Sequence, residues 1–356
     1  MLREIKNTVK VASIYISTII GAGFASGQEI VQFFSKYYEK GFYGIILAGV
    51  LFALIGLIVL DKVYRERIRN YDEFLFPTVG WFMGWVMEIA VTLFFMSLFC
   101  VMIAGMGNII SNRFGVPLKY CVMIITLICM AVVLTDIKGI ATLSTVVTPL
   151  LIMGILVIGL YIIVFRDTSA FNAAYCVEKA TRNWFFSSIL YVGYNSLMSI
   201  VVMCGLLPLL FTRSVGIAGG FLGGLSLCAI ALVINTVLLT FSPDSLADEL
   251  PILEIANRYG ATVNAIYSIV LFTAMFLSAV NSGYCLLNRI GSKIRVNAKI
   301  LAFAICILAV PLSGFGFSNL ISTVYPFFGY LGLFMVIAVL IEGVKLFCDY
   351  SGTPEL

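Results

Sequence analysis

The sequence predicts an all-α integral membrane protein with ten transmembrane helices arranged as two inverted five-helix repeats. The chain is 61% hydrophobic and only 11% charged, whereas soluble domains carry about 25% charged residues. Ten apolar stretches are long enough to cross a bilayer, which takes about 20 residues. The first and sixth stretches contain small, flexible and polar residues, which predicts that helices 1 and 6 are unwound at mid-membrane.

Five apolar stretches precede a polar connection and five follow it. They run over 8–37, 41–62, 83–112, 117–135, 139–165, 183–212, 215–241, 261–288, 298–313 and 317–346. Because each half has an odd number of helices, the second half enters the membrane inverted. The predicted units are a first repeat (1–165), an extracytoplasmic connection (166–182), a second repeat (183–346) and a cytoplasmic tail (347–356).

The distribution of basic residues predicts the orientation in the membrane. Most of the 22 Lys and Arg residues fall in the terminal segments and loops on the N-terminal side of the ten-helix arrangement. Positive charge marks the cytoplasmic side, so we expect a multi-pass protein of the cell membrane with both termini in the cytoplasm. The net charge of +4 thus reflects topology, and nothing indicates a nucleic-acid partner. No pattern specifies an oligomeric state.

The first stretch contains a run of small residues, Gly21-Ala-Gly-Phe-Ala-Ser-Gly27. Glycine lets the backbone leave a helix and approach a ligand closely. The half-helix that resumes near Ser26 would offer unpaired N–H groups, which suit a carboxylate. The motif is therefore a candidate site for the carboxylate of a solute. The alternative is that the small residues form a helix-packing surface.

The sixth stretch contains Tyr191-Val-Gly-Tyr-Asn-Ser196. A half-helix that ends near Tyr191 would leave carbonyl groups free, and these suit an ammonium group or a cation. The candidate solute residues here are Tyr191, Gly193, Tyr194 and Asn195. The alternative is that the Tyr and Asn side chains form hydrogen bonds between helices.

Three polar side chains of the eighth stretch share one helix face. Ser278, Asn281 and Ser282 stand at positions i, i+3 and i+4. Their oxygen atoms, together with carbonyls freed in the first stretch, would hold a small cation such as sodium. Hydrogen bonding between helices is an equally weighted alternative.

Two acidic residues are expected within the bilayer, where a carboxylate is costly and marks a functional candidate. Glu29 adjoins the first run of small residues and could carry a proton, gate the outer path or face a cationic solute. Glu88 lies nearer the cytoplasmic side and could instead pair with a basic residue there.

Other residue types argue against an enzyme. The chain has no histidine and its nine cysteines are scattered, so neither a metal-ligand cluster nor a disulfide framework is indicated. Paired carboxylates and nucleophilic constellations are absent too. We expect no cofactor, with Na⁺ as the candidate coupling ion.

Two connections carry helix signals of their own. The cytoplasmic connection includes Tyr71-Asp-Glu-Phe-Leu-Phe-Pro77, which predicts a short interfacial helix. The outer connection over 242–260 has capping residues followed by apolar ones, which predicts a helical hairpin that acts as a lid, or else a solvent-facing connector.

The pattern resembles the amino acid–polyamine–organocation superfamily, with its LeuT-like fold of two inverted five-helix repeats. More narrowly, Ile20-Gly-Ala-Gly-Phe-Ala-Ser-Gly-Gln-Glu-Ile30 resembles the first-helix signature of the bacterial YkvI-like amino acid permeases. The resemblance covers almost the whole chain in length and helix order. It implies that the solute carboxylate meets the first break, at Ala22, Gly23, Ala25, Ser26 and Gly27. It also implies a sodium site at Gly21 and Phe24 with Ser278, Asn281 and Ser282, where Asn281 departs from the usual hydroxyl residue.

The residues and the resemblance together predict a secondary transporter of a small zwitterionic solute, an amino acid or a related amine. Ion-coupled alternating access would come from rocking of helices 1, 2, 6 and 7 against helices 3, 4, 8 and 9, a division implied by the resemblance. The rival reading is a ligand sensor of the same fold that does not transport.

Overall fold

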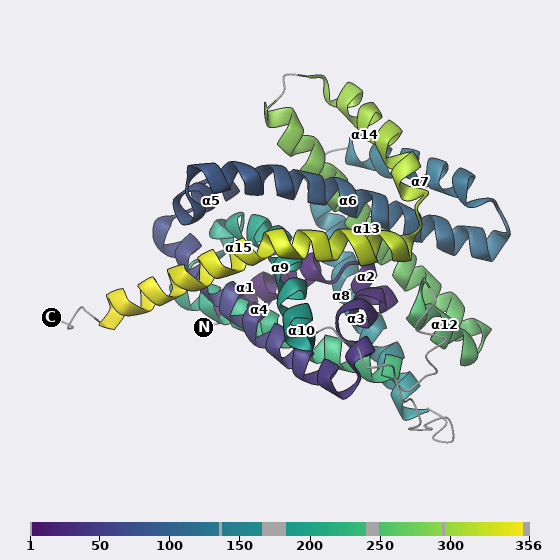
Figure 1. The fold of residues 1–356 in the computed structure, drawn as a ribbon, viewed down its shortest axis with the longest axis horizontal. Helices are drawn as coiled ribbons and strands as arrows, with labels where there is room; N and C mark the ends of the chain where they lie inside the picture. Colours follow the sequence, from purple (N-terminus) through teal and green to yellow (C-terminus); the bar gives the residue numbers. More distant parts are fainter. Residues whose placement is uncertain (1, 135–136, 166–182, 240–248, 294–295, 352–356) are drawn as a thin grey trace.

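A computed structural model describes residues 2–134, 137–165, 183–239, 249–293 and 296–351. Figure 1 shows its fold, in which every regular element of the described residues is a helix. The first half contains α1 (Leu2–Ile19), α2 (Ala22–Ser26), α3 (Gln28–Phe33), η1 (Ser35–Tyr37), α4 (Glu39–Glu66), α5 (Tyr71–Val79), α6 (Trp81–Phe114), α7 (Leu118–Val133) and α8 (Ile137–Val164). The second half contains α9 (Trp184–Cys204), η3 (Leu207–Leu209), α10 (Arg213–Leu239), α12 (Pro251–Arg258), α13 (Ala261–Lys293), α14 (Ala298–Ser313) and α15 (Phe317–Ser351).

Most of the long helices are apolar enough to cross a membrane. Six meet this criterion in the described part of the chain, namely α4, α6, α9, α10, α13 and α15. Large apolar side chains also face outward from them, such as Leu93 at 54% exposure and Ile269 at 68%, which suits contact with lipid. The chain is therefore a multi-pass membrane protein. The count of ten spans and the division into inverted repeats stay predictions.

Corresponding helices of the two predicted halves pack on each other. The second helix of each half forms the pair α4–α10, and the third forms the pair α6–α13. In the first pair the backbones touch, because a side chain at Gly220 or Gly224 of α10 would overlap α4 at Gly56 or Ala53. Contacts this close make α4 and α10 a tightly packed pair, an arrangement that suits two related halves.

The interruption predicted at Tyr191–Ser196 is absent, because α9 is one continuous helix from Trp184 to Cys204. Asn195 Nδ2 donates to the Tyr191 carbonyl at 3.1 Å and Ser196 Oγ donates to the Val192 carbonyl at 2.7 Å. These i to i−4 bonds direct the polar side chains onto their own helix.

The glycine in this part of α9 serves packing. A Cβ at Gly193 would lie 2.6 Å from the Gly329 carbonyl oxygen of α15, and one at Gly332 would overlap Gly193 itself. The prediction was wrong because a glycine that lets two helices approach looks, in sequence, like a glycine that breaks one.

Both helix signals in the connections correspond to helices. The interfacial helix predicted near residues 71–77 is α5, and the outer connection contains α12. Ile252 and Ile255 of α12 are buried, so this helix packs on the bundle, against α2, α10 and α13. The predicted connection at 166–182 and the segment 242–248 lie outside the described residues, as does most of the predicted tail.

The ends of the described chain lie on one side of the molecule. In Figure 1 the start of α1, the end of α15 and α5 are all toward the left, whereas α12 and the start of α4 are on the opposite side. The topology predicted from charge makes the first side cytoplasmic and the second extracytoplasmic.

Candidate functional site

The first predicted span is interrupted at both ends of its glycine-rich motif, between α1 and α2 and again between α2 and α3. α1 ends at Ile19 and α2 begins at Ala22, so the interruption predicted here is present. The Gly21 N–H donates to the Ile19 carbonyl at 2.8 Å, a shorter loop than an α-helical bond. Gly27, between α2 and α3, has a φ of 84°, which favours glycine. A Cβ there would also lie 2.8 Å from Ile252 Cγ1 of α12.

Two of the predicted solute residues are bonded within the protein. Ala25 and Ser26 are fully buried. The Ala25 carbonyl accepts a hydrogen bond from Tyr267 Oη of α13 at 2.5 Å, and Ser26 Oγ donates to the Gly23 carbonyl at 3.1 Å. These groups hold α2 in place against α13. Ala22 begins α2, but its side chain is outside the described part of the structure.

The space beside Gly23 is filled by Glu29. Because the chain turns at Gly27, the first turn of α3 lies over α2, and a Cβ at Gly23 would be 2.8 Å from Glu29 Cγ. Glu29 is 3% exposed. Tyr194 Oη of α9 donates to Glu29 Oε2 at 2.5 Å. Among the described residues, Glu29 has no ion-pair partner.

Aromatic rings from four helices surround the Glu29–Tyr194 bond. The Tyr194 ring lies 4.7 Å from Tyr325 of α15, 5.5 Å from Phe33 of α3 and 6.1 Å from Phe94 of α6, between ring centroids. Tyr191 of α9 lies 5.5 Å from both Tyr194 and Phe33. These separations are typical of packed aromatic pairs. We call Glu29 and these rings the Glu29 chamber.

Two hydroxyl groups of the chamber have no hydrogen-bond partner in the described structure. They belong to Tyr191 and Tyr325, whose side chains are 2% and 0% exposed. Most buried polar atoms are paired, and an unpaired one costs about 1–3 kcal/mol. The chamber therefore has capacity for further hydrogen bonds that the protein itself does not use.

The residues of the predicted sodium site lie partly together. A Cβ at Gly21 would be 3.5 Å from Ser278 Oγ of α13, so the first break and α13 meet at these residues. Ser282 Oγ donates to the Ser278 carbonyl, and Asn281 is half-buried on the same helix. The Phe24 carbonyl accepts the Gly27 N–H at 3.1 Å. Gly21 and Ser278 thus lie next to each other, while Phe24 and Ser282 are engaged in bonds of their own segments.

Glu88 is paired with basic residues, as one of the two readings of the sequence expected. It is buried on α6, Lys293 Nζ of α13 lies 2.7 Å from its Oε1, and Arg289 bonds its Oε2. This carboxylate joins α6 to α13 as a structural ion cluster.

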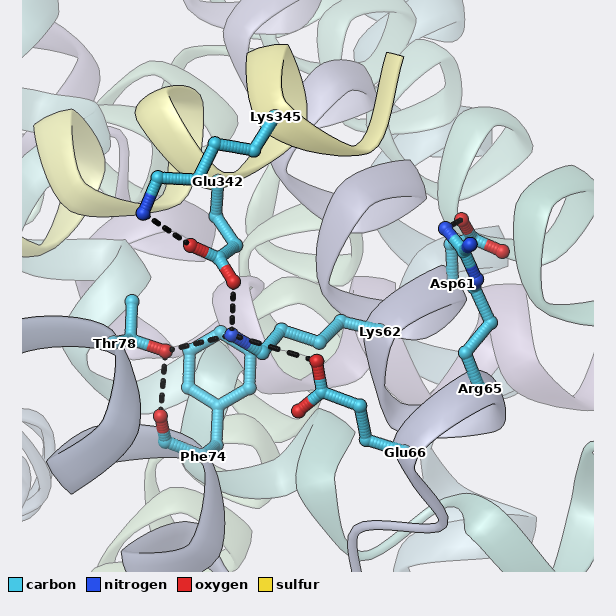
Figure 2. Close-up of polar contacts among 8 residues, drawn as sticks. All are labelled: Asp61, Lys62, Arg65, Glu66, Phe74, Thr78, Glu342 and Lys345. Carbon is cyan, nitrogen blue, oxygen red and sulfur yellow. Dashed lines mark hydrogen bonds and ion pairs between the residues drawn. The ribbon is translucent and has the colours of Figure 1, made fainter. Parts of the chain in front are cut away.

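A second ion cluster ties α4 to α15 on the same side of the molecule (Figure 2). Lys62 of α4, 2% exposed, lies 2.5 Å from Glu342 of α15 and 3.8 Å from Glu66. Its ammonium also donates to Thr78 of α5 at 3.2 Å. One buried cation therefore holds α4, α5 and α15 together.

A cavity of about 450 Å³ adjoins the Glu29 chamber on the side that the predicted topology makes extracytoplasmic, and we call it the outer cavity. Phe33 lines this cavity and is also part of the chamber wall. The other lining residues include Lys36, Ser187, Leu190, Ser322 and Tyr330. The volume falls in the range of small-molecule sites.

The structure thus unites some predicted residues and separates others. Gly23, Glu29, Tyr191 and Tyr194 meet in one place. Gly193 faces α15 and Asn195 bonds its own helix, so neither is arranged as the sequence predicted. Tyr325 was missed, because one tyrosine in the long apolar stretch 317–346 gives no signal until α15 is packed on α9.

Two proteins of Bacillus subtilis have sequences similar to this chain. The chain is 29% identical over 333 residues to the uncharacterized membrane protein YkvI, covering 93% of this chain and 94% of that one. It is 24% identical over 330 residues to the uncharacterized protein YyaD, covering 92% and 94%. No family model matches the chain.

Similar solved structures are transporters of low sequence identity. A manganese transporter of Eremococcus coleocola has a TM-score of 0.62 at 12% identity, covering 97% of this chain and 89% of that one. A Na⁺-coupled sialic acid symporter has a TM-score of 0.59 at 14% identity, covering 92% and 78%. Mhp1, in an inward-facing conformation, has a TM-score of 0.59 at 13% identity, covering 93% and 75%. The chain therefore has the LeuT-like fold of these transporters and is similar, over nearly its whole length, to YkvI.

Proposed function

We propose that the chain is a secondary active transporter that moves a small zwitterionic solute, an amino acid or a related amine, across the bacterial cytoplasmic membrane. Transport is ion-coupled and uses alternating access. The LeuT-like fold supports the transporter class. The observation that carries the proposal is the buried Glu29 carboxylate beside the interrupted first helix.

A carboxylate in this position is expensive to keep. Glu29 is buried in a chain whose long helices are apolar, and its hydrogen-bond donor is a neutral phenol. An acidic side chain inside a membrane protein without a basic partner is a functional candidate by default. Its place at a discontinuous helix matches the place of solute sites in transporters built from inverted repeats.

The position of the chamber suits alternating access. Its walls come from the first and sixth predicted spans on one side, through α3 and α9, and from α6 and α15 on the other. Rocking of helices 1, 2, 6 and 7 against helices 3, 4, 8 and 9 would move Phe33 and Tyr194 relative to Phe94 of α6. Such a movement would change which side of the membrane reaches Glu29.

Two coupling ions are compatible with this proposal. Sodium would bind where Gly21 meets Ser278. A proton would be carried by Glu29 itself. In either case binding of ion and solute is reciprocal, so that each changes the affinity of the other by the same factor.

Uptake into proteoliposomes tests the proposal. The purified chain is reconstituted and given radiolabelled amino acids and amines, under an inward sodium gradient, an inward proton gradient or neither. We expect at least one solute to accumulate under one of the gradients, and Glu29→Gln to abolish accumulation. Glu39→Gln removes the same charge at an exposed position of α4 and serves as the matched control. Binding of a solute without any flux would instead identify a sensor.

A further inference from the structure

We propose that Glu29 and the hydroxyl groups of Tyr191 and Tyr325 form a subsite for the primary ammonium group of the solute. This inference rests on the proposed transporter function. Of the solutes proposed there it selects the related amine, a primary amine with no carboxylate next to the ammonium, over a zwitterion. The three acceptors come from α3, α9 and α15, and all three side chains are at most 3% exposed.

The acceptors match a primary ammonium in number. An –NH₃⁺ group has three N–H donors and no acceptor. The Glu29 carboxylate accepts one bond from Tyr194 and has further lone pairs. The hydroxyl oxygens of Tyr191 and Tyr325 have no partner in the described structure. Three donors thus meet three acceptors, and the buried hydroxyls gain the bonds that the protein alone leaves unmade.

The surroundings also favour a cation. Ring faces stabilise a positive charge within about 6 Å of the ring centroid, and the rings of Phe33, Phe94 and Tyr194 pack together around Glu29. Tyr194, bonded to Glu29 at 2.5 Å, fixes the orientation of the carboxylate. Tyr194 is therefore a positioning residue, and the three acceptors make the direct contacts.

A carboxylate on the solute would meet repulsion in this chamber. The sequence places the solute carboxylate beside Gly23, but the Glu29 side chain fills that space in the structure. Two carboxylates that share a buried site do not both stay ionised. A zwitterion would have to displace Glu29, whereas a simple amine would pair with it.

The outer cavity gives such an amine an approach. Phe33 lines the cavity on one side and the chamber on the other. A volume of about 450 Å³ accommodates a small amine. To reach Glu29 from this cavity, the solute would displace the Phe33 ring.

Binding of matched probes tests the proposal. The full chain in lipid nanodiscs is titrated calorimetrically with linear primary amines from ethylamine to hexylamine. Each amine is compared with its N-trimethyl analogue and with the amino acid of which it is the decarboxylated form. We expect at least one amine to bind, and both its analogues to bind at least about tenfold more weakly, since hydrogen bonds to a charged group contribute roughly tenfold or more each.

Variants of the tyrosines separate the subsite from a structural role. Tyr325→Phe and Tyr191→Phe remove only a hydroxyl, and each should weaken amine binding roughly tenfold without lowering the thermal unfolding midpoint. Tyr71 of α5 also has a buried hydroxyl without a partner, outside the chamber, so Tyr71→Phe is the matched control. It should bind amines like the natural chain.

Three results would overturn the subsite. They are the absence of binding by every amine, equal binding of an amine and its matching amino acid, and unchanged amine affinity in Tyr325→Phe. Uptake assays keep this outcome apart from the proposed function. A chain that accumulates amino acids but binds no amine is a transporter without the subsite, and a chain that binds amines without flux has the subsite but does not transport.

Discussion

Glu29 and Glu88 are buried to nearly the same degree, at 3% and 4% exposure, but their neighbouring residues differ. Glu88 lies between Arg289 and Lys293, so its charge is neutralised by two cations. Glu29 lies among aromatic rings with one phenol as its donor. Desolvating a carboxylate is costly in both places. The difference teaches that the protein itself neutralises the charge of Glu88, whereas no basic residue of the described structure neutralises the charge of Glu29 beside the interrupted helix.

The largest expected effect that tests this comparison is a loss of transport without a loss of stability when Glu29 is replaced. Glu29→Gln should lower uptake by about a hundredfold, because a buried charge pair with the solute contributes roughly 2–5 kcal/mol. The same variant should unfold at an equal or higher temperature, since it removes a buried charge that has no basic partner among the described residues. Uptake and thermal unfolding are measured on the same preparation. A strongly destabilised variant would mean that Glu29 is structural, like Glu88.

The next effect is the opposite one, loss of stability in the ion cluster of Figure 2. Glu342→Gln leaves the buried Lys62 ammonium without its partner at 2.5 Å. Breaking a buried pair costs about 3–5 kcal/mol, and the 19% exposure of Glu342 favours the lower value. Denaturation in SDS measures the loss.

Two further variants serve as controls for that cluster. Lys345 is 68% exposed and lies 3.5 Å from Glu342, so Lys345→Gln should cost less than about 1 kcal/mol. The double variant Lys62→Met/Glu342→Leu should recover most of the stability, because an apolar pair can replace a buried ion pair. Failure of the double variant to recover would show that the charges do more than hold the helices.

Two glycines extend the comparison from charge to packing. Gly193→Ala places a methyl group 2.6 Å from the Gly329 carbonyl, so we expect a loss of about 1–3 kcal/mol from overpacking. Gly21→Ala meets only Ser278 Oγ, at 3.5 Å, and should cost less than about 1 kcal/mol. Denaturation in SDS compares the two. Equal losses would mean that Gly193 does not serve packing in the way the structure indicates.

These two glycines also mark what the sequence could predict. The break at Gly21 was predictable because several small residues stand close together, and Gly27 takes a backbone conformation that favours glycine. Gly193 was misread because its role depends on Gly329 and Gly332, far along the chain. A local pattern does not say which helix will lie against it.

The chamber was predictable to a similar extent. An acidic residue inside an apolar span is costly wherever it packs, so Glu29 could be selected from sequence alone. Its relation to Gly23 could not, because it depends on the turn at Gly27 that folds α3 over α2. Tyr325 joins the chamber only through the contact of α15 with α9. Burial selects the residue, and tertiary packing supplies its partners.

The smallest expected effect concerns Glu249, an acidic residue that is less buried than Glu29 and Glu88. It lies outside the membrane-spanning helices at half burial, and Asn108 of α6 donates to its carboxylate. Burial raises the pKa of Glu249 above its ordinary value, although a hydrogen bond from the Phe317 backbone opposes the rise. A raised pKa in the folded state means that stability is greatest at low pH and declines as pH rises through that pKa.

Glu249→Gln should reduce the loss of unfolding free energy with rising pH, by less than about 1 kcal/mol because the group is only half-buried. The amide oxygen of Gln can still accept the Asn108 bond, so the variant changes charge and little else. Thermal unfolding from pH 4 to pH 8 measures the difference between the two proteins. An identical pH dependence in both would mean that solvent compensates the Glu249 charge fully. The lack of a basic partner would then indicate a functional carboxylate only where burial is nearly complete, as at Glu29.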